Sequence, residues 1–369
     1  MILARNISQN AYAFRLATIS VMIKLMVKRG KRIEYIDVAR ALGMIAIIIG
    51  HVGFSTWPVI VRIMFSFHLP IFFIISGLLA RKYPWRELIK KRFKSLIVPY
   101  LITSAVIIAL VFILRHTGAN FWGAPARSTW SWVLSALYGS GYNYEFGIQP
   151  IGAIRFLLAM FFASLFLNLI IDKKYRFVYA GLAMLVTYMI APHFWAPWSI
   201  LSAIVGTFYM LIGVKMKEIG LNRLMKWPIV LGSFIVWLCV LLISVKTPDY
   251  FSMVRLSFSI LPLDIVAAIA GSFCILAIAK LIEKYLRPVA DALKPFGEYS
   301  LIVLCVHLID LCFIDWHAII RFLGFNFGIN GLSALRLVGQ FIWCICWVLI
   351  FRVVRNRQKV RAAFAAKEK

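Results

Sequence analysis

Apolar and polar residues alternate along the chain in long blocks. Ten predominantly apolar stretches come close to the length, about 20 residues of α-helix, that crosses a hydrocarbon core of roughly 30 Å. Short segments rich in Lys and Arg separate them. We therefore predict an all-α integral membrane protein with about ten transmembrane helices, at residues 36–54, 60–80, 96–114, 151–171, 177–192, 197–214, 228–245, 257–279, 297–315 and 333–351.

The two ends of the chain differ from this pattern. Residues 11–27 carry Arg15 and Lys24, which makes them a poor span and a reasonable amphipathic helix lying in the membrane interface. The amino terminus has no short apolar core followed by a small-residue cleavage site, so we expect no removable signal peptide. The predicted organisation is an N-terminal cytoplasmic and interfacial segment, a transmembrane domain and a basic cytoplasmic tail, at residues 1–32, 33–352 and 353–369.

Composition supports a membrane protein, and the charge predicts its orientation. Hydrophobic residues make up 62% of the chain and charged residues only 15%, outside the range of soluble proteins. The net charge is +27, but 32 of the 41 Lys and Arg residues lie in the segments that face the cytoplasm if both termini do. Anionic lipid headgroups are the expected partners of this charge. A nucleic-acid partner is not expected, because the basic runs lack interleaved aromatics and a nucleic-acid fold.

Two further compositional features bear on chemistry. All six cysteines fall inside apolar stretches without metal-ligand spacing, so neither disulfides nor a metal site is expected. The longest outer loop, 115–150, is rich in aromatics that suit either the headgroup interface or stacking on a sugar ring. These aromatics are Trp122, Trp130, Trp132, Tyr138, Tyr142 and Tyr144.

Three ionisable side chains lie inside the first predicted span. Such residues are costly in a bilayer and usually face a cavity, so Asp37, Arg40 and His51 are candidate functional residues. A helix places Arg40 and His51 within roughly 20° of one face and about 16 Å apart along its axis. Asp37, three residues before Arg40, is placed to orient the guanidinium. Taken singly, Arg40 also suits a cation that reaches lipid phosphate, and His51 a helix end that faces water.

The second predicted span adds polar and small residues. Pro70 frees a backbone carbonyl, and Gly77, which follows Ser76, permits close helix packing. If the first two spans form an antiparallel hairpin, His51 and His68 lie at similar depths. The alternative for His68 is a packing histidine that is hydrogen-bonded to a carbonyl.

Ordered motifs in these segments resemble a known family. The IDVAR...GH stretch, then FHLPIFFIISGLLA, then KKRFKSLIVPY at 90–100 resemble the acyltransferase 3 family of membrane O-acyltransferases, particularly its fucose 4-O-acetylase-like branch. Arg40 and His51 match the family's spacing of Arg, ten residues and His. GAIRFLLAMFF at 152–162 resembles the family's fourth-span segment, and FGEYSLIVLCVHLI at 296–309 places His307 at the family's histidine.

The resemblance implies an activity and a location. It implies transfer of an acyl group, usually acetyl from cytoplasmic acetyl-CoA, to a hydroxyl of a surface glycan or lipid-linked sugar, in a bacterial cytoplasmic membrane. It also makes 33–352 the acyltransferase domain. The chain departs from the family at a place where two arginines often stand three residues apart. Here Ser95 stands three residues after Arg92, and Lys91 and Lys94 are the alternative pair. A second departure is Arg155, which replaces a tryptophan usual in that branch and indicates a different acceptor.

The residues themselves fit acyl transfer. Attack of a hydroxyl on a thioester needs a base that titrates near neutrality, which His51 supplies. Arg40, held by Asp37, is suited to the phosphate or pantetheine end of the donor, or to charge that develops on the thioester carbonyl. We predict that these three residues are catalytic and that substrate or cofactor binding involves His68, Ser76, Lys91, Arg92, Lys94, Arg155 and His307. Weaker candidates are Asp264, Glu298 and Asp310.

Other interpretations remain at this point. The basic residues between 86 and 94 equally suit a plain cytoplasmic loop. A secondary transporter or flippase would also have many helices and intramembrane charges, although the two halves of this chain do not look alike, as such folds usually do. A membrane protein that takes up or senses a small ligand without catalysis is the third interpretation.

Overall fold

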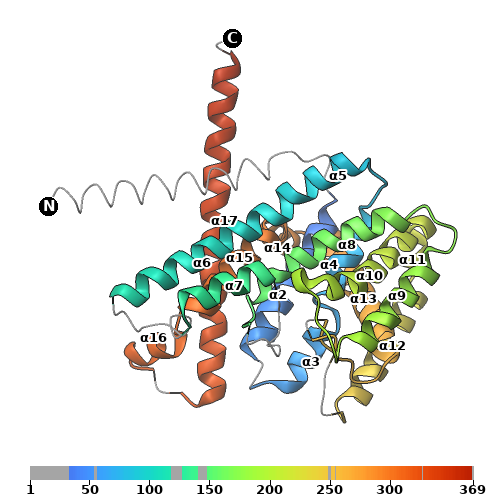
Figure 1. Cartoon of the computed structure of the whole chain (residues 1–369), viewed down its shortest axis with the longest axis horizontal. Coiled ribbons are helices and arrows are strands. Elements are labelled where there is room, and N and C mark those ends of the chain that lie inside the picture. The colour runs from blue at the N-terminus through green and yellow to red at the C-terminus, as the bar shows by residue number, and fades with distance from the viewer. Residues whose placement is uncertain are drawn as a thin grey trace.

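A computed structural model describes most of the chain. It covers residues 33–53, 56–117, 127–139, 148–247, 251–253, 255–325 and 327–367. Throughout these ranges the chain is helical or irregular, with one isolated bridge between Ser252 and Ser257 and no β-strand. The predicted all-α fold is confirmed (Figure 1). The predicted interfacial helix at 11–27 lies outside the described residues.

The first half of the chain forms helices that begin close to the predicted spans. The predicted second span is two helices, because α3 ends at Phe67 and α4 begins at Pro70. The helices and helical turns of this half are α2 (Glu34–Val52), α3 (Pro58–Phe67), α4 (Pro70–Leu78), α5 (Trp85–Arg92), the π-helical turn η1 (Phe93–Ile97), α6 (Val98–Thr117), α7 (Thr129–Tyr138), η3 (Ala153–Arg155), α8 (Phe156–Ile170) and α9 (Arg176–Ile190).

The second half departs from the predicted boundaries at two places. The span predicted at 257–279 begins only at Leu263, after an irregular stretch, and the one predicted at 297–315 is preceded by a separate helix. The elements of this half are η4 (Pro197–Ser199), α10 (Ile200–Ile219), α11 (Leu221–Leu224), α12 (Trp227–Ser244), α13 (Leu263–Tyr285), α14 (Arg287–Glu298), α15 (Ser300–Phe313), α16 (Trp316–Phe322) and α17 (Ile329–Lys367).

Length and composition identify the helical segments that can cross a membrane. In the described part of the chain, eight are long and apolar enough, and a ninth results if α14 and α15, which bend by 70° at their junction, count as one span. The remaining predicted span, at 177–192, corresponds to α9, a shorter apolar helix of 15 residues. Each predicted range therefore overlaps a helix, while the number that cross the bilayer and the location of both termini stay predictions.

Close helix contacts hold the centre of the bundle together. A Cβ added at Gly77 would lie 1.9 Å from the carbonyl oxygen of Met210, so only glycine lets α4 and α10 approach so closely. A Cβ added at Gly297 would lie 1.7 Å from the carbonyl oxygen of Asp37, which fixes α14 against the start of α2. The close packing predicted for Gly77 is confirmed.

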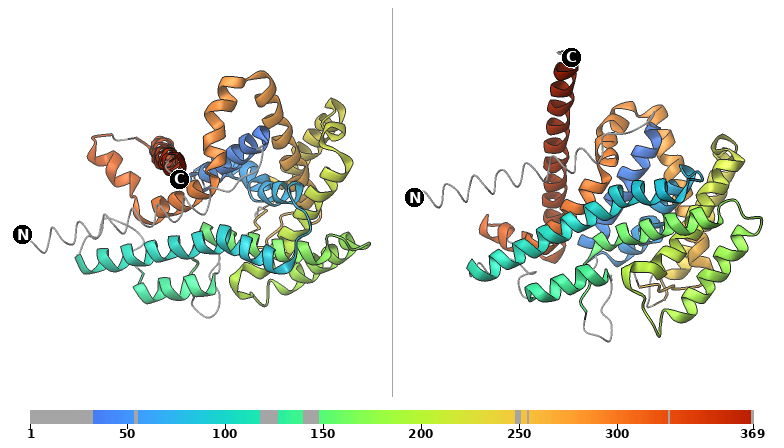
Figure 2. Two further views of the ribbon diagram at one scale, coloured as in Figure 1. Left: turned by 90° about the horizontal axis from the view of Figure 1, so that it is seen from above. Right: turned by 45° about the horizontal axis from the view of Figure 1, so that its top comes forward.

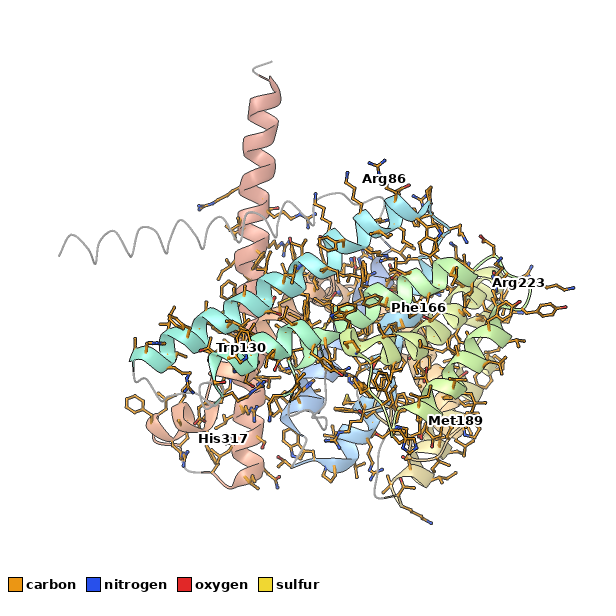
Figure 3. All side chains as sticks on the ribbon, viewed as in Figure 1. Arg86, Trp130, Phe166, Met189, Arg223 and His317 are labelled. Atoms are coloured by element: carbon orange, nitrogen blue, oxygen red, sulfur yellow. The ribbon has the colours of Figure 1, made fainter. Side chains whose placement is uncertain are left out.

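The views of Figures 1 and 2 show a central bundle with helices at its margin. α5 and α6 form one long helical run along one side, and α17 stands beside α15 and extends beyond the bundle at its carboxyl end. Arg86 lies toward the top of the molecule and His317 toward the bottom in Figure 3. The orientation predicted from the basic loops stays a prediction.

Candidate active site

The predicted pair at the start of α2 is present. Nη1 of Arg40 donates a hydrogen bond of 3.2 Å to Oδ1 of Asp37, whose side chain is 7% exposed. The two residues are three apart on one helix, which brings their side chains to the same face. Asp37 also lies under Gly297, so its backbone is fixed by α14. The carboxylate thus neutralises and orients the guanidinium, as the sequence indicates.

Arg40 lines a cavity with a volume of about 520 Å³. We call it the Arg40 cavity. Its polar lining comes from α2, α4, the α5–η1 segment and the α14–α15 junction, so helices far apart in sequence enclose it. The polar residues are Asp37, Arg40, Ser76, Lys91, Arg92, Ser95, Glu298, Tyr299 and Ser300. The π-helical turn at Phe93–Ile97 contributes Ser95 to this lining, and such turns often occur at functional sites.

Lys91 is held at this cavity by Tyr83. Its Nζ donates a hydrogen bond of 2.8 Å to the Tyr83 hydroxyl and lies 4.4 Å from the ring centroid. Burial raises the pKa of the Tyr83 phenol, but hydrogen bonds and charge from Lys91 and Arg81 outweigh it and hold the pKa below its usual range. Lys94 does not join the cavity. It lies in an open groove with Arg86 and Lys90 instead.

A second, smaller cavity of about 170 Å³ holds two histidines and is called the His51 cavity. His51 comes from the end of α2, His68 from the break between α3 and α4, and Arg155 from η3. His68 and Arg155 are 4% and 5% exposed. The ring of Phe65 lies near both histidines, with centroid distances of 6.4 Å to His51 and 4.5 Å to His68. The prediction that both histidines lie at similar depths is consistent with this shared cavity.

Both histidine rings are oriented by their own helices. Nδ1 of His51 lies 2.7 Å from the carbonyl oxygen of Ile47, and Nδ1 of His68 lies 3.0 Å from that of Met64. A carbonyl oxygen only accepts, so in each case the neutral imidazole carries its proton on Nδ1. Nε2 is then left with a free electron pair, which is what a general base requires.

His307 lies behind His51. The two rings are 5.4 Å apart, edge to face, and His307 is completely buried on α15. Within the described part of the chain, neither ring nitrogen of His307 has a hydrogen-bond partner. One turn further along α15, Oδ1 of Asp310 accepts a hydrogen bond of 2.7 Å from Nε1 of Trp316. His307 thus contacts the candidate base and does not line its cavity.

The two cavities meet at three apolar side chains. Ile47, Phe156 and Leu304 line both cavities and come from α2, α8 and α15. Along α2, residues of the Arg40 cavity precede Ile47 and His51 follows it. On α15, Ser300 and Leu301 of the Arg40 cavity precede Leu304. Arg40 and His51, predicted to share one face of the helix, are therefore separated by these three residues, which we call the wall.

The cavities sort the predicted site residues into two groups. The Arg40 cavity brings together Asp37, Arg40, Ser76, Lys91 and Arg92, and the His51 cavity brings together His51, His68 and Arg155. Sequence reasoning did not identify Tyr299, Ser300, Ser202 or the wall, because apolar and hydroxyl residues are common in spans and carry no local signal. Among the described residues, no group of three or more His, Cys, Asp or Glu side chains is placed to hold a metal ion.

Comparison with known proteins places the chain among membrane acyltransferases. A family model described as an acyltransferase domain matches residues 33–354, most of the chain, so the protein belongs to the acyltransferase 3 family. The resemblance predicted from the motifs is confirmed at the level of the family, and the fucose 4-O-acetylase-like branch stays a prediction. A search of curated proteins found no match.

Proposed function

We propose that this membrane acyltransferase moves an acyl group, acetyl in the first instance, from acyl-CoA to a hydroxyl of an extracytoplasmic or lipid-linked sugar. In this proposal the donor occupies the Arg40 cavity and the acceptor hydroxyl enters the His51 cavity. The observation that carries the proposal is that one helix, α2, lines both cavities, with Arg40 and Asp37 in one and His51 in the other.

The lining of the Arg40 cavity supports its role as the donor site. Arg40, Lys91 and Arg92 supply three cations, and charge-assisted hydrogen bonds from such groups suit the phosphates of CoA. Lys91 and Arg92 belong to the basic segment at 81–94, which the distribution of Lys and Arg predicts to be cytoplasmic. CoA is a cytoplasmic metabolite, so the donor would enter from that side.

The reaction follows from the orientation of His51. Nε2 of His51 accepts the proton of the acceptor hydroxyl as its oxygen forms a bond to the thioester carbonyl carbon. The C–S bond then breaks, sulfur leaves with the electron pair, and the proton passes from His51 to that sulfur. The products are the ester and free CoA. Arg155, buried in the same cavity, is suited to position the acceptor or to stabilise negative charge on the carbonyl oxygen.

Labelling tests this proposal directly. Membranes from cells with and without the gene would receive acetyl-CoA labelled in the acetyl group, and glycan and lipid-linked sugar fractions would be extracted. We expect label in one of these fractions and release of CoA thiol only when the protein is present. Thiol release without label in either fraction would contradict a sugar acceptor, and no protein-dependent thiol release would contradict the use of acetyl-CoA.

A further inference from the structure

In the proposed function, donor and acceptor meet at the wall. The reacting oxygen must come within about 3–3.5 Å of the thioester carbon. In the proposed function, the oxygen is held by His51 on one side of Ile47, Phe156 and Leu304, while the CoA body lies on the other side. The thioester must therefore pass between these three side chains, and its acyl tail must end in the His51 cavity.

The room beyond the wall is small. A cavity of about 170 Å³ holds roughly five groups the size of a water molecule, at about 30 Å³ each. The carbonyl and methyl of an acetyl group and the acceptor hydroxyl fill most of this space. Buried apolar residues such as Phe65 and Phe73 also line this cavity, so a longer acyl chain has little free space beside the acceptor.

We infer that Phe156 selects the acyl chain by length, an inference that rests on the proposed function. Phe156 is the largest wall residue and is held by aromatic contacts with α4. Its ring lies 5.9 Å from that of Phe72 and 5.3 Å from that of Phe73, edge to face in both cases. Phe72 lines the Arg40 cavity and Phe73 the His51 cavity, so the three rings continue the wall across α4.

The other two wall residues are less suited to this role. Ile47 lies one turn before His51 on α2, and its backbone carbonyl accepts the hydrogen bond that orients His51, so a shift of the helix backbone at Ile47 would also disturb the base. Leu304 is one turn from His307, which contacts His51. Phe156 can be shortened without touching either histidine contact. Removing its ring joins the two cavities and gives a longer acyl chain space to turn back toward the Arg40 cavity.

The test compares acyl-CoA substrates of increasing length. Purified wild type and Phe156→Ala would be assayed for CoA thiol release with acetyl-, butyryl- and hexanoyl-CoA in the presence of the extracted membrane glycan and lipid-linked sugar fraction. One methylene that fits or fails to fit a pocket changes specificity by about 10- to 200-fold. We expect wild type to favour acetyl-CoA, and the ratio of kcat/KM for hexanoyl-CoA to that for acetyl-CoA to rise at least ~10-fold in Phe156→Ala.

A matched variant on the same helix serves as control. Phe162 also packs against aromatic rings, with Phe161 at 5.2 Å and Trp198 at 6.2 Å, but it lines neither cavity. Phe162→Ala should keep the wild-type ratio of kcat/KM for hexanoyl-CoA to that for acetyl-CoA. If Phe156→Ala does not fold, Phe156→Leu keeps an apolar side chain and should still raise the ratio of kcat/KM for butyryl-CoA to that for acetyl-CoA.

The outcomes separate the inference from the proposed function. An unchanged ratio in a folded, active Phe156 variant, or a wild type that uses hexanoyl-CoA as well as acetyl-CoA, would overturn chain-length selection and leave acyl transfer standing. An equal rise in the ratio for Phe162→Ala would show a general loosening of α8 and would also overturn the inference. A wild type that releases thiol from none of the three donors would overturn the proposed function, and the inference with it.

Discussion

The Arg40 cavity and the His51 cavity differ in size, charge and construction. The first has about three times the volume of the second and is lined by three cations, two carboxylates and several hydroxyls. The second is mostly apolar, with two histidines and one buried arginine. The first is built at the α5–η1 segment and the α14–α15 junction, and the second at the end of α2, the break between α3 and α4, and η3.

This difference suggests a division of labour. A large charged ligand such as a CoA ester needs an open polar site, because its phosphates must be neutralised by several cations. A reaction with a weak nucleophile needs a small site that excludes water and holds the base in one orientation. Variants in the two cavities should therefore affect different steps, catalysis in the His51 cavity and donor binding in the Arg40 cavity.

The largest effect is expected for the candidate base. His51→Ala should lower kcat by roughly 10²–10⁴-fold, because the proton of the acceptor hydroxyl then has no acceptor at Nε2. The Kd for acetyl-CoA should stay close to that of wild type, since His51 lies beyond the wall. Thiol release and calorimetric binding of acetyl-CoA measure the two quantities.

His116 provides a matched control for this change. Its Nδ1 lies 2.8 Å from the carbonyl oxygen of Phe112, four residues earlier, as Nδ1 of His51 lies close to that of Ile47. The His116 side chain, however, is exposed at the end of α6. His116→Ala should keep wild-type turnover. Full activity of a folded His51→Ala protein would remove His51 from the mechanism.

The next largest effect is expected on donor binding. Arg40→Gln should weaken acetyl-CoA binding about 10- to 100-fold, the effect of losing one charged hydrogen bond of about 1.5–3 kcal/mol. Its effect on kcat should be smaller than that of His51→Ala. Arg223→Gln, at an exposed position outside both cavities, is the control. An Arg40 variant that binds acetyl-CoA normally and loses only kcat would place Arg40 at the reacting atoms instead.

Packing under the Arg40 cavity should be intolerant of added volume. Gly297→Ala places a methyl group against the carbonyl of Asp37 and should cost about 1–3 kcal/mol of stability, seen as a lower thermal midpoint in detergent. Gly232→Ala on α12 has no neighbouring atom within 4 Å and should leave the midpoint unchanged or raise it slightly. Equal midpoints for the two variants would contradict the close contact between α14 and α2.

The smallest effect on acetyl-CoA binding should distinguish Lys91 from Lys94, two lysines of one basic segment. Lys91→Ala should weaken acetyl-CoA binding by no more than about fivefold, because exposed charges contribute roughly 0.2–1 kcal/mol. Lys94→Ala should not change binding, since Lys94 lies in the open groove away from the cavity. Equal losses for both lysines would favour a general electrostatic effect of the segment over a defined contact.

Much of the fold could be predicted from the sequence because membrane helices carry a local signal. Apolar stretches of the right length identified helices, and spacing of three placed Asp37 beside Arg40. The bend at the α14–α15 junction could not be predicted in this way. Pro295 lies inside α14 and α15 begins at Ser300, but a proline is also tolerated in straight spans, so its consequence depends on the neighbouring helices.

The site was only partly predictable for a related reason. Arg40, His51 and His68 stand out as polar residues in apolar segments, whereas Phe156 and Leu304 are indistinguishable from other apolar residues of their spans. Their role depends on contact between α2, α8 and α15, which are more than 100 residues apart in sequence. His307 was found through the family resemblance, and its contact with His51 required the structure.

The central claim, that donor and acceptor react across the wall from opposite sides, is tested most directly by sidedness. Intact inverted vesicles and intact right-side-out vesicles would receive labelled acetyl-CoA, which does not cross membranes. We predict that the sugar fraction of intact inverted vesicles is labelled and that this labelling depends on His51. Right-side-out vesicles should be labelled only after permeabilisation. Equal labelling of both intact preparations would contradict a donor site that opens only on the side of the basic loops.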